Sequence, residues 1–85
     1  MNRNELLQKV EEVCRDIFED DQLTVSEETS AADIEGWDSL THLSLISELE
    51  EVFDIAFTLD ETTGSKKLGD LISAIERHIG GKEVR

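Results

Sequence analysis

The chain has 85 residues, 38% of them hydrophobic, and a formal net charge of −13 at pH 7. This length predicts one domain over residues 1–85, with an ordered core over about 4–80, and argues against an active-site cleft built between domains. The acidity argues against nucleic acid and anionic membranes, whose phosphates would repel the protein, and favours basic protein partners. Residues 16–65 contain no lysine or arginine, so the acidity is concentrated in the middle of the chain.

Cysteine usage and hydropathy both favour a cytoplasmic protein. Cys14 is the only cysteine, so the chain can form neither an intramolecular disulfide nor a cysteine-cluster metal site. Its spacing from Val10 and Ile17 places it on an apolar helical face, where we expect it to fill the core. The sequence shows no N-terminal apolar run and no stretch of roughly 20 apolar residues. We therefore expect no signal peptide and no membrane span, and we expect a monomer.

Apolar side chains at three- and four-residue spacing predict three main helices, over residues 5–19, 40–53 and 67–79. Asp38 is the expected N-cap of the second helix. The third helix is expected to end at Gly80-Gly81, followed by a frayed tail. The inward stripe predicted for the second helix is Leu40, Leu43, Ile46, Leu49 and Phe53, widened by Leu45 and Val52.

The segments between these helices break the helical pattern. Residues 20–38 are expected to form a long loop, whose apolar anchors into the core are Leu23, Val25, Ala31, Ile34 and Trp37. Residues 54–59 are expected to be extended, and residues 60–63 to form one helical turn that Gly64 stops. The predicted fold is an all-α bundle of three main helices and one short helix, with a long loop between the first and second helices.

The segment Gly36-Trp37-Asp38-Ser39-Leu40 places a serine at the junction of this loop and the second helix. We expect its hydroxyl to be exposed beside the helix N-terminus, where free N–H groups and the helix dipole favour a phosphate. The sequence arranges no general base for catalysis. The pattern therefore indicates a serine that is modified, not one that attacks a substrate.

In motif and layout the chain resembles the acyl carrier proteins and their peptidyl carrier relatives, over nearly its whole length. Gly36-Trp37-Asp38-Ser39-Leu40 fits the Gly-x-Asp-Ser-Leu signature, Leu49-Glu50-Glu51-Val52-Phe53 ends the second helix at the usual spacing, and Lys67-Leu68-Gly69-Asp70-Leu71 is similar to the start of the final helix. The resemblance implies that Ser39 carries 4′-phosphopantetheine, whose thiol holds acyl or aminoacyl groups as thioesters. It also implies that the chain itself is not an enzyme.

The resemblance further implies three kinds of partner: a phosphopantetheinyl transferase, an acyl- or aminoacyl-loading ligase or transferase, and downstream synthase enzymes with basic docking surfaces. The residues expected to recognise them are Asp38, Leu40, Glu48, Glu50 and Glu51. For Leu40 the alternative is core packing, and for the three glutamates it is solubility alone.

The pathway in which the cargo is processed is indicated by differences from the housekeeping fatty-acid carriers. Thr41 and Ser44 are neutral where the housekeeping fatty-acid carriers have acidic residues, and Trp37 and His42 also differ from those carriers. These differences favour a specialised polyketide, peptide, sugar-modifying or fatty-acid-like pathway.

Two sequence features resemble those of other functional classes. Asp-Ser-Leu is similar to the motif of Gly-Asp-Ser-Leu hydrolases, and His42 follows Ser39 by three residues, but Trp37 interrupts the motif and nothing orients the histidine. The run 16–27 has the length of a calcium loop, but Asp21 stands where a glycine is required. An acidic helical adaptor without a prosthetic group therefore remains the alternative, and no metal site is expected.

Overall fold

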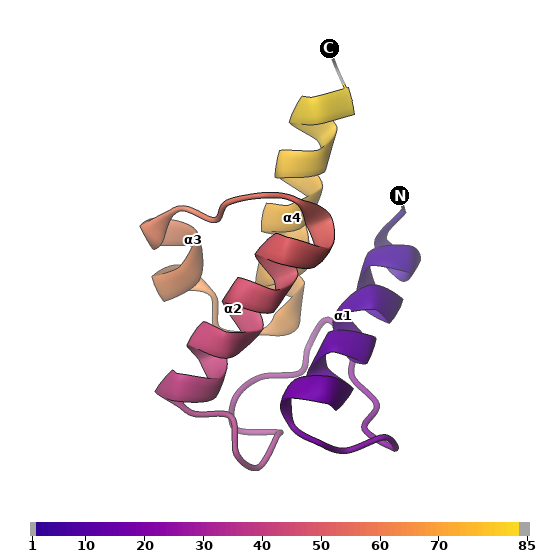
Figure 1. Ribbon diagram of the computed structural model, residues 1–85, viewed down its shortest axis with the longest axis vertical. Helices are drawn as coiled ribbons and strands as arrows, with labels where there is room; N and C mark the ends of the chain where they lie inside the picture. Colours follow the sequence, from indigo (N-terminus) through magenta and orange to yellow (C-terminus); the bar gives the residue numbers. More distant parts are fainter. Residues whose placement is uncertain (1, 84–85) are drawn as a thin grey trace.

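The computed structural model describes the backbone of residues 2–83 and the side chains of residues 2–80 (Figure 1). Four helices follow one another: α1 (Arg3–Ile17), α2 (Ser39–Phe53), α3 (Leu59–Gly64) and α4 (Leu68–Glu83), and no strand occurs among these residues. α1 and α3 lie on opposite sides of α2, and the long loop joins α1 to α2. The predicted all-α bundle is confirmed. No helix within residues 2–83 is long and apolar enough to cross a membrane.

Side-chain caps explain where the first three helices begin. The Asn2 side chain accepts from the Glu5 N–H at 2.9 Å, and the Thr58 hydroxyl accepts from the Glu61 N–H at 3.2 Å. Asp38 caps α2, as the sequence predicts. Each cap satisfies N–H groups that have no partner inside the helix, which is why the chain enters the helix at that residue.

A single apolar core holds α1, α2 and α4 together. Its fully buried side chains are Leu6, Val10, Cys14, Leu45, Leu49, Leu68, Leu71, Ile72 and Ile75. Cys14 is a core residue, as expected, and burial raises the pKa of its thiol to about 12. α3 contributes no buried residue to this core.

The inward stripe predicted for α2 is confirmed for Leu45, Ile46 and Leu49. It is wrong for Leu40, Leu43 and Val52, of which Val52 is 43% exposed. Leu40 is 76% exposed and Leu43 is 61% exposed, whereas Leu45 is fully buried. The buried face follows Leu45, Ile46 and Leu49, so it points toward α1 and into the core that α4 also lines. The apolar residues at the start of α2 lie outside this face and are exposed.

The predicted end of the last helix is also wrong, because α4 continues through Gly80 and Gly81 to Glu83. A glycine inside a helix costs only about 1 kcal/mol relative to alanine, which continued hydrogen bonding of the helix can offset. Residues 84–85, where a frayed tail was expected, lie outside the described part of the chain.

Short polar contacts and a few apolar side chains hold the long loop. Ile34 is buried, and Leu23, Val25 and Trp37 pack partly buried against the core, but Ala31 is exposed and is not an anchor. The loop backbone accepts hydrogen bonds from the start of α4: Leu68 N–H donates to Thr29 O at 2.9 Å and Gly69 N–H to Glu27 O at 2.8 Å.

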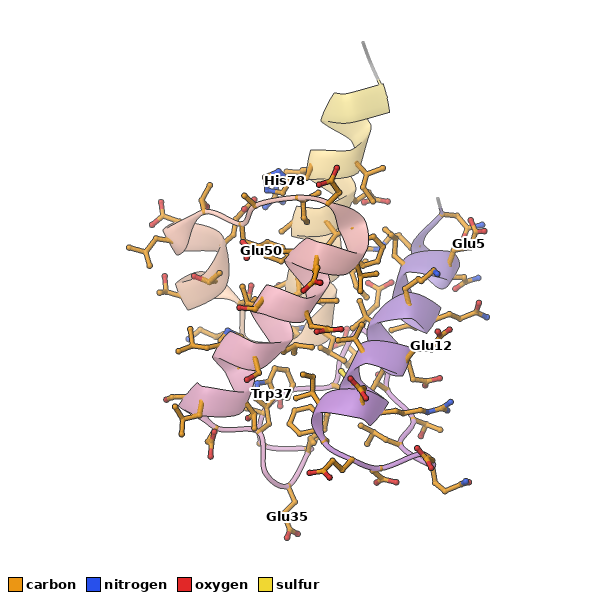
Figure 2. All side chains as sticks on the ribbon, in the orientation of Figure 1. Glu5, Glu12, Glu35, Trp37, Glu50 and His78 are labelled. Carbon is orange, nitrogen blue, oxygen red and sulfur yellow. The ribbon has the colours of Figure 1, made fainter. Side chains whose placement is uncertain are left out.

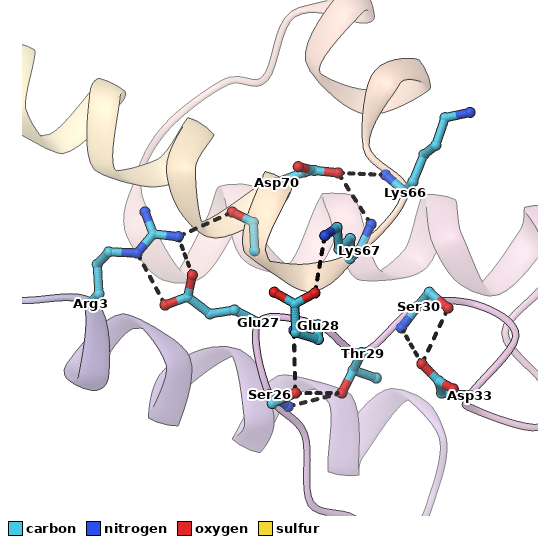
Figure 3. Close-up of polar contacts among 11 residues, drawn as sticks. Arg3, Ser26, Glu27, Glu28, Thr29, Ser30, Asp33, Lys66, Lys67 and Asp70 are labelled. Atoms are coloured by element: carbon cyan, nitrogen blue, oxygen red, sulfur yellow. Dashed lines mark hydrogen bonds and ion pairs between the residues drawn. The ribbon is translucent and has the colours of Figure 1, made fainter.

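A polar cluster joins the same loop to the ends of two helices (Figure 3). The Arg3 guanidinium at the start of α1 makes an ion pair and two hydrogen bonds with the Glu27 carboxylate, and this contact lowers the pKa of Glu27. Lys67 at the start of α4 pairs with Glu28 at 3.1 Å. The loop is therefore held at its middle, well before it reaches Ser39.

Polar side chains attach α3 to α4. The Glu61 carboxylate accepts from His78 Nε2 at 2.9 Å and from Arg77 Nη2 at 3.2 Å. These contacts, His78 first, lower the pKa of Glu61 to about 2. His78, expected to be a surface residue, is half-buried at this junction, and Figure 2 shows it on α4 near the loop that leads to α3.

Candidate functional site

Ser39 is the first residue of α2, and its side chain is exposed. Within residues 2–83 neither its hydroxyl nor its backbone N–H has a hydrogen-bond partner. A phosphate group on this oxygen would displace no existing contact of the hydroxyl. The geometry therefore fits a serine that receives a substituent at the positive end of the helix dipole.

The turn before Ser39 is fixed by a reciprocal cap. Asp38 Oδ1 accepts from the N–H groups of Leu40 and Thr41, each at 3.0 Å, while Asp38 N–H donates to the Thr41 hydroxyl at 2.7 Å. The Thr41 hydroxyl donates in turn to Gly36 O at 2.8 Å. Gly36 has a φ of 90°, a value that favours glycine.

This cap corrects one expectation about the site. The N–H groups of Leu40 and Thr41 are not free for a phosphate, because the Asp38 carboxylate already accepts both. The same hydrogen bonds, that of the Thr41 N–H first, lower the pKa of Asp38 and keep it ionised. A substituent on Ser39 therefore meets the N–H of Ser39 itself, the helix dipole and a fixed carboxylate at the preceding residue.

Thr41 is the functional residue whose role sequence reasoning missed. In the sequence, Thr41 stands out only because it is neutral where fatty-acid carriers have an acidic residue. In the structure its hydroxyl accepts from the Asp38 N–H and donates to Gly36 O, which completes the cap. The spacing of three residues from Asp38 was the available signal, but capping boxes usually carry Glu or Gln at this position.

An open groove of about 880 Å³ begins at Ser39 and runs between the long loop, α2 and α3. The groove forms inside the single bundle and not between domains. Its lining consists of Ser30, Ala31, Ala32, Trp37, Asp38, Ser39, His42, Leu43, Leu59, Thr62, Thr63, Ser65 and Lys66. The exposed Leu43 and Leu59 supply apolar surface from α2 and α3.

A histidine spans this groove. Trp37 Nε1 and His42 Nδ1 are 3.2 Å apart, and His42 Nε2 is 3.1 Å from Thr62 O on α3. Because an indole N–H can only donate, Nδ1 must accept and Nε2 must carry the proton that Thr62 O accepts. Neither ring nitrogen is left to take a proton from Ser39, which argues against the hydrolase arrangement.

The expected recognition residues differ in their surroundings. Leu40 is 76% exposed, so the core-packing alternative is excluded. Glu51 is exposed and Glu48 is half-buried. The Glu50 carboxylate accepts from Phe57 N–H at 2.9 Å, so it stabilises the connection from α2 to α3 (Figure 2).

No model of a protein family matches the chain. It is 30% identical over 80 residues to the acyl carrier protein of Lactobacillus acidophilus, covering 94% of this chain and all of that one. It is 33% identical over 73 residues to the acyl carrier protein of Clostridium acetobutylicum, covering 86% and 95% of the two chains. The solution structure of the holo acyl carrier protein of Geobacter metallireducens superposes with a TM-score of 0.85 at 37% identity, over 93% of this chain and 91% of that one. The chain therefore belongs to the acyl carrier protein family.

Proposed function

We propose that this protein carries acyl groups as thioesters on a 4′-phosphopantetheine arm attached to Ser39. Family membership supports the carrier role, and the exposed, unbonded hydroxyl of Ser39 in the described structure supports the attachment point. When bound, the arm supplies the thiol that forms the thioester. The chain contributes a fixed tether, a groove beside it and an acidic surface for partners.

The rigid turn before Ser39 is the observation that carries this proposal. Asp38 and Thr41 form reciprocal hydrogen bonds, and Asp38 also accepts from the Leu40 N–H, so the backbone on both sides of Ser39 is held in place. The helix dipole favours the negative charge of a phosphodiester there. A transferase would thus meet a helix start whose backbone is already held by the cap.

Intact mass after incubation with coenzyme A and a broad-specificity phosphopantetheinyl transferase tests the attachment. We expect one pantetheinyl addition to the wild type and none to Ser39→Ala. Ser44→Ala is the matched control, because Ser44 is also exposed on α2, and it should be modified like the wild type. An unmodified wild type, or an addition that persists in Ser39→Ala, would contradict the assignment. The first result would favour the adaptor function.

Asp38, Leu40, Glu48 and Glu51 are proposed to contact the transferase, the loading enzyme and the downstream synthases. The absence of lysine and arginine from residues 16–65 makes this surface suited to basic docking sites. Glu50 is left out of this set, because its carboxylate accepts a hydrogen bond from the Phe57 backbone. Its substitution would alter the fold of the α2–α3 connection as well as the charge.

Asp38→Asn separates capping from recognition. Asparagine caps helices about as well as aspartate, so we expect little change in Tm. Removing the charge should lower the kcat/KM of the transferase several-fold at low ionic strength, and the difference should shrink as salt is added. Glu12→Gln, an exposed position on α1 (Figure 2), removes an equal charge away from Ser39 and should leave this rate unchanged. Equal effects of the two variants would refute local recognition.

We also infer that the chain is a single carrier domain that acts in the cytoplasm as a monomer, and the one buried free cysteine supports the cytoplasmic location. We infer that the domain is not catalytic, because both ring nitrogens of His42 already have hydrogen-bond partners. The neutral residues at positions 41 and 44 support a specialised pathway over housekeeping fatty-acid synthesis.

A further inference from the structure

The groove beside Ser39 lies next to the apolar core at His42, in the first turns of α2. His42 precedes Leu45 by three residues and Ile46 by four, so its side chain neighbours both along the helix. Leu45 and Ile46 are buried, whereas His42 is half-buried and lines the groove. His42 therefore lies between the groove and the buried Leu45 and Ile46.

Two hydrogen bonds of His42 connect α2 to the long loop and to α3. Its Nε2 contact with Thr62 O is the one hydrogen bond between α2 and α3 in the part of the chain that the structure describes. On its other side the ring accepts from Trp37 Nε1 at 3.2 Å and stacks on the indole with 6.0 Å between ring centroids and 22° between planes. The loop, α2 and α3 are thus joined across the floor of the groove by one imidazole.

α3 depends on such contacts because it has no buried residue of its own. On the side of α4 it is attached through the Glu61 carboxylate to His78 and Arg77. On the side of α2 it is attached through His42. Without the second attachment, α3 could move away from α2 and expose a path toward Leu45.

We propose that the Trp37–His42–Thr62 bridge determines cargo specificity by keeping the acyl chain in the surface groove. The proposal rests on the function assigned to Ser39. An apolar chain that entered between α2 and α3 would have to separate the His42 ring from Thr62 O and leave polar groups without partners. The wild-type protein is therefore suited to short acyl groups, which lie in the open groove and need no contact with the interior. Long apolar chains gain little shielding.

The test compares chain lengths on the intact protein. Wild type and His42→Ala are loaded from acetyl- and decanoyl-coenzyme A with the same transferase, and each product is verified by intact mass. In the wild type we expect nearly equal Tm values for the two forms and equal rates of thioester cleavage by hydroxylamine. In His42→Ala the decanoyl form should melt several degrees above its acetyl form, and its thioester should be cleaved several-fold more slowly, since burial of the chain stabilises the fold and shields the bond.

Two further variants make the result specific. Trp37→Phe removes the indole N–H but keeps an aromatic ring, so it should show the same dependence on chain length in weaker form, even if His42→Ala does not fold. His78→Ala cuts the other histidine contact of α3, away from the groove lining, and should lower Tm without any dependence on chain length.

The outcomes separate this proposal from the assignment of Ser39. A wild type that receives no arm overturns the function itself. If the wild type is loaded correctly but its decanoyl form already melts well above its acetyl form, only the role of the bridge is overturned. The same holds if the Tm and cleavage rate of the His42 and Trp37 variants do not depend on acyl-chain length.

Discussion

The two sides of α2 are built differently. Toward α1 and α4 the helix presents side chains such as Leu45 and Leu49 that are fully buried. Toward α3 it presents a groove, one imidazole bond and the exposed Leu43. Apolar burial holds the first side, and polar contacts of defined direction hold the second.

This difference shows how a small carrier can be both stable and adaptable. Burial of apolar area supplies most of the free energy of folding and depends little on a few degrees of helix movement. Individual hydrogen bonds contribute about 1 kcal/mol each and are lost when their atoms separate. The position of α3 therefore depends on a few individual hydrogen bonds, whereas the core does not.

The largest expected effect is on the free energy of unfolding, and a pair of leucine truncations measures it on the two sides of α2. Leu49→Ala removes a fully buried side chain and should lower the free energy of unfolding by about 2–5 kcal/mol. Leu59→Ala, at the 76% exposed start of α3, should change it by less than about 0.5 kcal/mol. Urea denaturation measures both. Similar losses for the two variants would show that α3 contributes to the core after all.

A glycine pair tests the contact between the long loop and α4. A Cβ at Gly69 would lie 2.8 Å from Glu27 O, so Gly69→Ala must displace the loop backbone and should cost about 1–3 kcal/mol. Gly64→Ala is the control, since a Cβ at the end of α3 meets no atom within 4 Å. Thermal unfolding should show a clear loss only for the first, and an unaffected Gly69→Ala would mean that the loop is loosely held.

The smallest effect concerns the attachment of α3 to α4. Glu61 has its pKa lowered from 4.5 to about 2, so its stabilising contribution is complete above pH 4.5 and is lost as the pH falls toward 2. Glu61→Gln should therefore be less stable than the wild type by about 1 kcal/mol near pH 7, and the gap should close as the pH falls through this range.

Asp60→Asn is the control for that experiment, because Asp60 is an exposed neighbour in the same helical turn. Its stability should follow that of the wild type at every pH. A gap between Glu61→Gln and the wild type that stays constant down to pH 2 would mean that the contact does not depend on the ionised carboxylate.

The sequence was sufficient to predict the helices, the Asp38 cap and the exposed serine, because these follow from local periodicity and from residue types at helix starts. It was insufficient for Leu40 and Leu43, since both fit a helical stripe and only the position of the neighbouring helices decides which residues of that stripe are buried. The role of His42 needs Trp37 and Thr62 in three dimensions, and no spacing in the chain brings those three together. Gly80 and Gly81 show that a strong helix-ending signal can be overridden when the helix is anchored by core residues upstream.

The buried Cys14 has a consequence for how cargo is assigned. A thiol with a pKa of about 12 is almost never a thiolate near neutral pH, and thiolates are the species that exchange with thioesters. Since no other cysteine exists in the chain, the polypeptide offers no reactive thiol that could take an acyl group from the arm. An acyl label bound as a thioester on the native protein can therefore be ascribed to its prosthetic group.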